Sequence, residues 1–200
     1  MAETLDPQTL AAASKLEVFD AEGKKVTFGS LYADKKTVVV FIRHFFCGVC
    51  KLYVEDLMQV PDSAFALADT KLVLIGCGEW KGIQPYHEMT GYKGPIYADP
   101  SRKLYSLLGL VQNLKMTPEG KTRPSYLKMS RFQNLIFSIR TGYMSYPFLT
   151  FSAGKWSQNG GEFVLGRGNN CSFIHRMQNT EDHTEVVDLM RHAGVEYTPA

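Results

Sequence analysis

A short apolar stretch that leads directly into a Cys-x-x-Cys motif constrains this chain more than any other feature. Residues 38–42 are all β-branched or aromatic, which is typical of a buried parallel strand. The motif follows at Cys47 and Cys50, and apolar residues then recur at helical spacing until Pro61, where a helix must end. The sequence therefore predicts a core strand, a short turn and a helix whose first turn carries both cysteines.

The predicted position of the cysteines has chemical consequences. The first turn of a helix has unpaired N–H groups and a partial positive charge, so it stabilises a thiolate. Cys47 is therefore the candidate nucleophile, and Cys50 is placed to form a disulfide with it. Arg43 and His44 lie just upstream and would add positive charge. Because neighbouring strand residues point to opposite faces, only one of them is expected to face the cysteines, and we favour Arg43.

Half of a zinc site is the alternative interpretation of a Cys-x-x-Cys motif. Such a site needs further ligands, but Cys77 and Cys171 are isolated and the sequence has no second Cys-x-x-Cys and no His-x-x-x-His. We therefore favour redox chemistry and expect neither a metal nor another cofactor. Cys77 lies in a glycine-rich turn, where it is either an alternative resolving thiol or, as we favour, a small buried residue.

Length and composition set broader limits. The chain has 200 residues, so we expect a single domain over residues 1–200. A net charge of +2 with scattered Lys and Arg residues gives no basic stripe for nucleic acid. No apolar run approaches membrane-spanning length, and the first residues lack the pattern of a secretory signal. We therefore expect a cytoplasmic protein, where cysteines stay reduced unless they are catalytic.

The remaining pattern predicts a thioredoxin-like α/β fold with an N-terminal hairpin extension. Parallel strands with helical crossovers, followed by an antiparallel pair, give a mixed central sheet with helices on both faces. The predicted elements are a short N-terminal helix, a hairpin at residues 16–28, strands at residues 37–42, 72–75 and 96–98 with a helix after each, antiparallel strands at residues 162–165 and 171–175, and a closing helix at residues 184–192.

An aromatic-rich insertion at residues 110–161 precedes the last two strands in this scheme. The helix before it is predicted at residues 101–108, with Asp99 as its N-cap and Pro100 at its first position. Within the insertion, apolar and aromatic residues at 132–143 predict an amphipathic helix. The insertion either covers the mouth of an active site, forms a surface for a partner, or pads the edge of the core.

These motifs together resemble the AhpC/TSA antioxidant enzyme domain-containing family, in its peroxiredoxin-like 2 group, within the thioredoxin-like superfamily. The resemblance implies a thioredoxin fold and a thiol-based antioxidant or reductase activity, with Cys47 and Cys50 as the redox pair and Arg43 as a close neighbour. Asp182-His183 adds a smaller match. Four segments carry the resemblance: VVVFIRHFFCGVCKLYVED (residues 38–56), LIGCGEWKGIQPYHEMTGY (residues 74–92), IYADPSRKLYSLLG (residues 96–109) and QNGGEFVLGRGNNCSFIHR (residues 158–176).

The chain departs from the patterns of its relatives at two points. A typical peroxiredoxin carries a proline and a Thr or Ser just before its peroxidatic cysteine, whereas His44, Phe45 and Phe46 precede Cys47 here. The hydroxyl that helps to orient peroxide is therefore absent. Thioredoxins place a cis-proline before the antiparallel hairpin, and residues 160–162, Gly-Gly-Glu, occupy that place in this chain.

Three functions are compatible with the sequence. The leading hypothesis is a thiol oxidoreductase that reduces a hydroperoxide or a related oxidised small molecule and is reset by an external thiol donor such as thioredoxin or glutathione. A second is reduction of a lipid endoperoxide, as the resemblance to prostamide-synthase-like relatives implies, with the aromatic insertion shaping an apolar pocket. The third is a thioredoxin-fold binding or scaffold protein without catalysis, since a fold alone does not fix chemistry.

Overall fold

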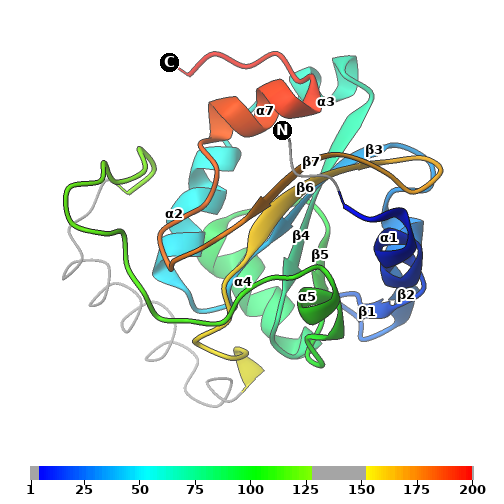
Figure 1. Cartoon of the computed structure of the whole chain (residues 1–200). Coiled ribbons are helices and arrows are strands. Elements are labelled where there is room, and N and C mark those ends of the chain that lie inside the picture. The colour runs from blue at the N-terminus through cyan, green and yellow to red at the C-terminus, as the bar shows by residue number, and fades with distance from the viewer. Residues whose placement is uncertain (1–4, 128–151, 200) are drawn as a thin grey trace.

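A seven-stranded mixed sheet forms the centre of the computed structural model, which describes residues 5–127 and 152–199 (Figure 1). The strand order is β2-β1-β5-β4-β3-β6-β7. β3, β4 and β5 run parallel, whereas β6 pairs antiparallel with both β3 and β7. The strands are β1 (Glu17–Phe19), β2 (Lys25–Thr27), β3 (Lys36–Phe41), β4 (Thr70–Gly76), β5 (Ile96–Ala98), β6 (Gly161–Gly166) and β7 (Asn170–Arg176).

Alternation along β3 divides the interior into two apolar layers. Val38 and Val40 face one layer, and Val39 and Phe41 face the other, because successive strand side chains point to opposite faces. All four side chains are fully buried. A strand with no solvated face reads as a continuous apolar run, and the run at residues 38–42 marks the centre of the sheet for this reason.

Helices cover both faces of the sheet, as the sequence predicts. α2 (Gly48–Leu57), α4 (Ile83–Thr90) and α7 (Val186–Ala193) contribute side chains to the layer that also contains both cysteines. α1 (Pro7–Ser14), α5 (Lys103–Leu107) and the 3-10 turn η1 (Phe28–Leu31) pack on the other face. Figure 1 shows α1 and α2 on opposite sides of the sheet. α3 (Asp62–Leu67) precedes β4, and the turn η2 (Trp80–Gly82) leads into α4.

The N-terminal hairpin extends this sheet. β1 pairs with β2 and also meets β5 through Phe19 and Ala98. The predicted hairpin is thus confirmed, and its antiparallel strands occupy the edge beyond the three parallel ones. The final antiparallel hairpin of β6 and β7 occupies the opposite edge. The Cys-x-x-Cys motif therefore lies near the middle of the sheet, where β3 ends and α2 begins.

α5 and α7 each begin two residues later than predicted, and a carboxylate contacts the chain at each of these ends. α5 begins at Lys103 after Arg102, whose φ is 55°; the Asp99 carboxylate still serves this end by accepting from the Leu104 N–H at 2.9 Å. α7 begins at Val186 rather than Thr184. The Thr184 hydroxyl instead donates to the Glu162 carboxylate at 3.0 Å, which holds residue 184 outside the helix.

The insertion is described at its two ends only. An isolated bridge joins Gln112 to Gln158 and closes these ends against each other. The helix predicted at residues 132–143 lies outside the described residues. Within the parts of the chain that the structure describes, no helix combines the length and apolar character that crossing a bilayer requires.

Candidate active site

Cys47 and Cys50 lie at the junction between β3 and α2. Cys47 is the N-cap of α2 and has extended backbone angles, φ −80° and ψ 112°. Its sulfur accepts a hydrogen bond from the Cys50 N–H at 3.4 Å. N-cap side chains satisfy the open N–H groups of a helix's first turn, and here the Cys47 sulfur performs that role. Both side chains are buried, so the two sulfur atoms meet protein groups rather than bulk water.

Arg43 makes the cationic contact to Cys47. One terminal guanidinium nitrogen lies 3.3 Å from the Cys47 sulfur, and the other donates to the Trp156 carbonyl at 2.7 Å. The backbone N–H of Arg43 points at the Cys50 sulfur from 3.3 Å. A single residue at the end of β3 therefore contacts both cysteines, the first through its side chain and the second through its main chain.

The Cys47 and Cys50 thiols have opposite pKa shifts. A hydrogen bond from the Cys50 side chain lowers the pKa of Cys47 well below its usual range, and the Arg43 charge lowers it further against the effect of burial. Burial and the hydrogen bond to Cys47 raise the pKa of Cys50 well above its usual range. In the reduced pair these shifts favour a Cys47 thiolate beside a protonated Cys50, which is the arrangement of a nucleophile and its partner.

His44 belongs to the same turn but carries no charge at neutral pH. Burial lowers the pKa of His44 to about 4. Its ring stacks on the Trp156 indole at a centroid distance of 6.2 Å. Arg43 is thus the basic residue of this turn whose side chain donates to the Cys47 sulfur.

The described end of the insertion forms one wall of this turn. The Phe45 N–H donates to the Ala153 carbonyl at 3.0 Å, and the Glu79 N–H donates to the Ser152 carbonyl at 2.8 Å. Together with Trp156, these residues place the segment at residues 152–156 against the β3–α2 turn. This described end of the insertion therefore contacts the turn that carries the cysteines.

A buried histidine and a buried glutamate lie on the other side of Cys50, and sequence reasoning missed both as site residues. The Nε2 atom of His183 is 3.5 Å from the Cys50 sulfur. The Nδ1 atom of the same ring is 2.5 Å from a Glu162 carboxylate oxygen. Both side chains are completely buried. The signal in the sequence was Glu162 itself, since a lone charge within an apolar strand demands a partner.

Aromatic rings hold the His183 imidazole in place. The Tyr53 ring, from α2, stacks on it with a centroid distance of 4.2 Å and an interplanar angle of 5°. Tyr126 meets it edge-on at 6.2 Å, and the Tyr126 hydroxyl accepts the His183 backbone N–H at 3.0 Å. The ring therefore has its two nitrogens directed along one line, from Cys50 to Glu162.

Comparison with known proteins identifies the family. A family model described as AhpC/TSA antioxidant enzyme matches residues 56–179. The mouse protein Peroxiredoxin-like 2C is 38% identical over 190 residues, which cover 94% of this chain and 82% of the mouse protein. The chain belongs to the AhpC/TSA antioxidant enzyme family. The matched model segment begins after Cys50, so the roles of the cysteine pair must be argued from their own geometry.

Two further comparisons show a named relative and a solved structure that this AhpC/TSA family member resembles. Prostamide/prostaglandin F synthase of Aquarana catesbeiana is 25% identical over 171 residues, covering 84% of this chain and 78% of that protein. The crystal structure of peroxidoxin BcpB from Mycobacterium tuberculosis superposes with a TM-score of 0.59 at 12% identity, covering 99% of this chain and all of that one. The structural match confirms the thioredoxin-like fold, and family membership supports a redox function.

Cys77 stands apart from the redox pair of this AhpC/TSA protein. Its thiol donates to the Arg43 carbonyl at 2.8 Å. Burial raises the pKa of Cys77 to about 12, so the thiol stays protonated and is a poor nucleophile. Gly154 packs so closely that a Cβ there would lie 2.7 Å from the Cys77 sulfur. These contacts favour the structural interpretation of Cys77 over a role as a resolving thiol.

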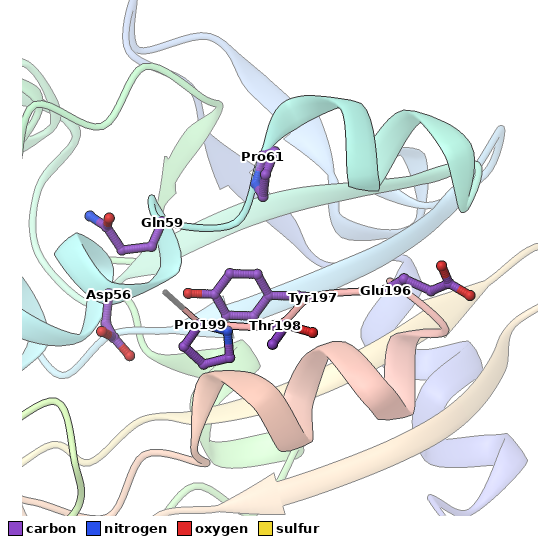
Figure 2. A pocket seen from close by; sticks show the side chains of 7 residues that line it. All are labelled: Asp56, Gln59, Pro61, Glu196, Tyr197, Thr198 and Pro199. Atoms are coloured by element: carbon purple, nitrogen blue, oxygen red, sulfur yellow. The ribbon is translucent and has the colours of Figure 1, made fainter.

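A hollow of about 340 Å³ lies at the far end of α2 (Figure 2). Asp56, Gln59 and Pro61 line it from one side, and residues 196–199 line it from the other. At 1.5 Å of rise per residue, Asp56 is about 14 Å along the helix from Cys47. This hollow is therefore separate from the cysteine site. Among the described residues, no group of three or more His, Cys, Asp or Glu side chains has an arrangement that would hold a metal ion.

Proposed function

We propose that this protein is a thiol-dependent oxidoreductase that reduces hydroperoxides, or a related oxidised small molecule, through Cys47 and Cys50. The observation that carries the proposal is the position of the Cys47 sulfur, which lies 3.3 Å from the Arg43 guanidinium and caps the first turn of α2. A cation and a helix N-terminus both favour the thiolate, which is the reactive form of cysteine.

The proposed reaction has two steps on the protein. The Cys47 thiolate attacks the outer oxygen of a hydroperoxide, so an S–O bond forms, the O–O bond breaks, and the alkoxide leaves as an alcohol after taking up a proton. Cys47 is oxidised to a sulfenic acid and the peroxide is reduced. Cys50 then attacks the Cys47 sulfur, forming a disulfide and releasing water.

An external thiol donor completes the cycle. Two electrons from a donor such as thioredoxin or glutathione reduce the disulfide to the two thiols, and we propose the cytosol, where such donors are present, as the place of action. Arg43 takes a second role in the attack. Its guanidinium can stabilise the negative charge that develops on the leaving oxygen.

Hydrogen peroxide consumption by the reduced protein tests the proposal, with dithiothreitol as the thiol donor. Wild-type protein should turn over and should show rapid alkylation of Cys47 by iodoacetamide at neutral pH. Cys47→Ser should abolish turnover, and Cys50→Ser should stop at the sulfenic acid, which dimedone labels. Full turnover by Cys47→Ser, or a Cys47 that alkylates no faster than a free cysteine, would show the proposal to be wrong.

Reduction of a lipid endoperoxide is the second candidate. Its support is the similarity to prostamide/prostaglandin F synthase of Aquarana catesbeiana, since an endoperoxide contains the same weak O–O bond. The same three proteins can be assayed with a prostaglandin endoperoxide. Rapid Cys47-dependent reduction of this substrate, with slow hydrogen peroxide consumption, would favour the second candidate. Inertness toward both substrates would favour a binding or scaffold protein.

A further inference from the structure

Three residues from distant parts of the chain form a buried line of polar atoms behind the redox pair. Cys50 comes from α2, Glu162 from β6, and His183 from the segment that precedes α7. The Cys50 sulfur and His183 Nε2 are 3.5 Å apart, and His183 Nδ1 and Glu162 Oε1 are 2.5 Å apart. The attack of Cys47 on a peroxide does not use this line, so it needs a separate explanation.

The hydrogen bonds of Glu162 determine which nitrogen of His183 carries the proton. The other carboxylate oxygen of Glu162 accepts from the Thr184 N–H at 3.3 Å and the Thr184 hydroxyl at 3.0 Å. An ionised carboxylate can only accept hydrogen bonds. His183 Nδ1 must therefore donate to it. In the neutral ring, Nε2 is left with a lone pair directed at Cys50.

We propose that His183 accepts the proton of Cys50 when Cys50 attacks the oxidised Cys47, and that Glu162 is the positioning residue that fixes the His183 tautomer. This inference rests on the proposed thiol oxidoreductase function and adds two residues to it. The arrangement follows the general logic of a nucleophile, a base and a group that orients the base.

The chemistry of the step explains why a base is needed there. In the reduced pair, the Cys50 thiol donates to the Cys47 thiolate. Once Cys47 carries the sulfenic oxygen, that thiolate is gone and Cys50 is a buried, protonated and weak nucleophile. His183 Nε2 then takes the proton as the S–S bond forms and the S–O bond breaks. The departing hydroxide takes the proton back, so water is released and the imidazole returns to its neutral form.

Reduction of the disulfide runs the same relay in the opposite direction. An external thiolate attacks the Cys47 sulfur, and Cys50 leaves as a thiolate into a buried, apolar region. A protonated His183, paired with Glu162, can supply the proton that neutralises this leaving group. Both steps that involve Cys50 should therefore depend on His183, whereas the attack of Cys47 on peroxide should not.

Single-turnover kinetics can separate these steps. Reduced protein is mixed with one equivalent of hydrogen peroxide, quenched with acid or dimedone, and analysed by mass spectrometry for the sulfenic acid and the disulfide. In His183→Gln and Glu162→Gln, the sulfenic acid should form at the wild-type rate. Its conversion to the disulfide should slow by about 100-fold in His183→Gln, in the range typical of general acid–base catalysis, and by about tenfold in Glu162→Gln. His192→Gln, which changes an exposed histidine of α7, is the matched control.

The pH dependence of disulfide formation supplies a readout that a merely structural role would not change. The shape of this pH profile should differ between wild-type protein and His183→Gln, because the group that accepts the Cys50 proton is absent from the variant. The profile should also change in Glu162→Gln, because the carboxylate that orients the His183 ring is lost. Among the described residues, the titratable and charged groups near Cys50 and His183 include Cys47, Arg43, Tyr53, Tyr86, Tyr105, Tyr126 and Glu162.

Two results would overturn the relay. The first is an unchanged rate and pH profile of disulfide formation in both variants, when circular dichroism shows native folding. The second is equal slowing of sulfenic acid formation, which would mean that the pair only supports the shape of the site. If wild-type protein does not react with peroxide, the proposed function fails on its own. The relay is then tested on the disulfide formed with diamide, whose reduction by dithiothreitol should still be slower in His183→Gln.

Discussion

Cys47 and Cys50 share one turn of α2, and the groups around their two sulfur atoms differ in kind. Cys47 meets the Arg43 guanidinium and the open end of the helix, so its surroundings supply fixed positive charge. Cys50 meets the imidazole of His183, which is backed by Glu162, so its surroundings supply a group that can gain and lose a proton. The difference matches two roles, with Cys47 as the attacking thiol and Cys50 as the resolving thiol. One sulfur is kept charged, whereas the other is kept neutral beside a base.

The two surroundings also differ in how the chain builds them. Arg43 lies four residues before Cys47, and one turn connects them. His183 lies 133 residues after Cys50, and it reaches Cys50 because Glu162 of β6, the neighbour of β3, holds the segment that leads into α7. The charge at Cys47 is therefore a local property of the β3–α2 turn, and the base at Cys50 is a product of the whole fold.

The Cys50 side should be the more sensitive of the two to loss of a single group. Glu162→Ala leaves the buried His183 N–H and the Thr184 donors without an acceptor, so the free energy of unfolding should fall by about 3–5 kcal/mol. Urea denaturation of the reduced protein measures this change. Glu196→Ala, which removes an exposed carboxylate, should change stability by less than about 0.5 kcal/mol. A loss below about 1 kcal/mol in Glu162→Ala would mean that the pair is not a structural anchor.

The Cys47 side contains two basic side chains, and acid should reveal that only one is charged in the folded state. The pKa of His44 is lowered to about 4, against about 6.5 in an unfolded chain. Between these values the unfolded chain binds a proton that the folded protein does not. The free energy of unfolding therefore decreases as the pH is lowered, by about 3 kcal/mol from this group at pH 4. In His44→Phe, which can keep a ring against Trp156, this part of the acid dependence should vanish.

Urea denaturation between neutral pH and acid compares the two proteins. The pKa of Cys47 measured by alkylation should change little in His44→Phe, because the histidine is neutral where Cys47 reacts. A large rise in that pKa would instead show that His44 shares the cationic role with Arg43. The surroundings of Cys47 would then contain two positive charges.

Arg43 itself should control the reactivity of Cys47. Replacing it with Met removes the charge that lowers the pKa of Cys47, so the thiolate should titrate at higher pH and the rate with peroxide should fall by about 100-fold at neutral pH. Arg43→Lys should recover part of the loss. Alkylation across a pH series and stopped-flow oxidation measure the two effects. Arg167→Met, at the turn between β6 and β7, should behave as wild type, and equal rates in Arg43→Met and wild type would contradict the assignment.

The contrast between local and distant contacts explains what the sequence could predict. The strand, the turn and the helix that hold Cys47, Cys50 and Arg43 lie within one short stretch, where periodicity and spacing fix relative positions. The mixed sheet and the helices on both faces follow from the element order for the same reason. The boundary of α5 was wrong because a side chain, Asp99, caps the helix from further away than its spacing suggests.

The His183–Glu162 pair could not be predicted in the same way. Its geometry depends on β6 pairing with β3 in a register that opposes Glu162 to Val40, and no local pattern specifies that register for a strand buried along its length. What the sequence does show is an acidic residue inside an apolar strand and a histidine next to Asp182. A buried charge requires a partner, and a search for that partner among the histidines would have limited the choice to five.

Cys77 provides a third case for the comparison, because its thiol contacts backbone carbonyl groups of Arg43 and Lys155. Its thiol donates to the Arg43 carbonyl, and a serine hydroxyl can make the same bond. Cys77→Ser should therefore change the rates of Cys47 oxidation and disulfide formation by less than about a factor of two, since a buried thiol with a raised pKa is unreactive. Peptide mapping after one equivalent of peroxide should find the Cys47–Cys50 disulfide in both proteins. A Cys47–Cys77 disulfide in the wild type, together with slower disulfide formation in Cys77→Ser, would instead show that Cys77 is the resolving thiol. The proposed proton transfer from Cys50 to His183 would then have no role in resolution.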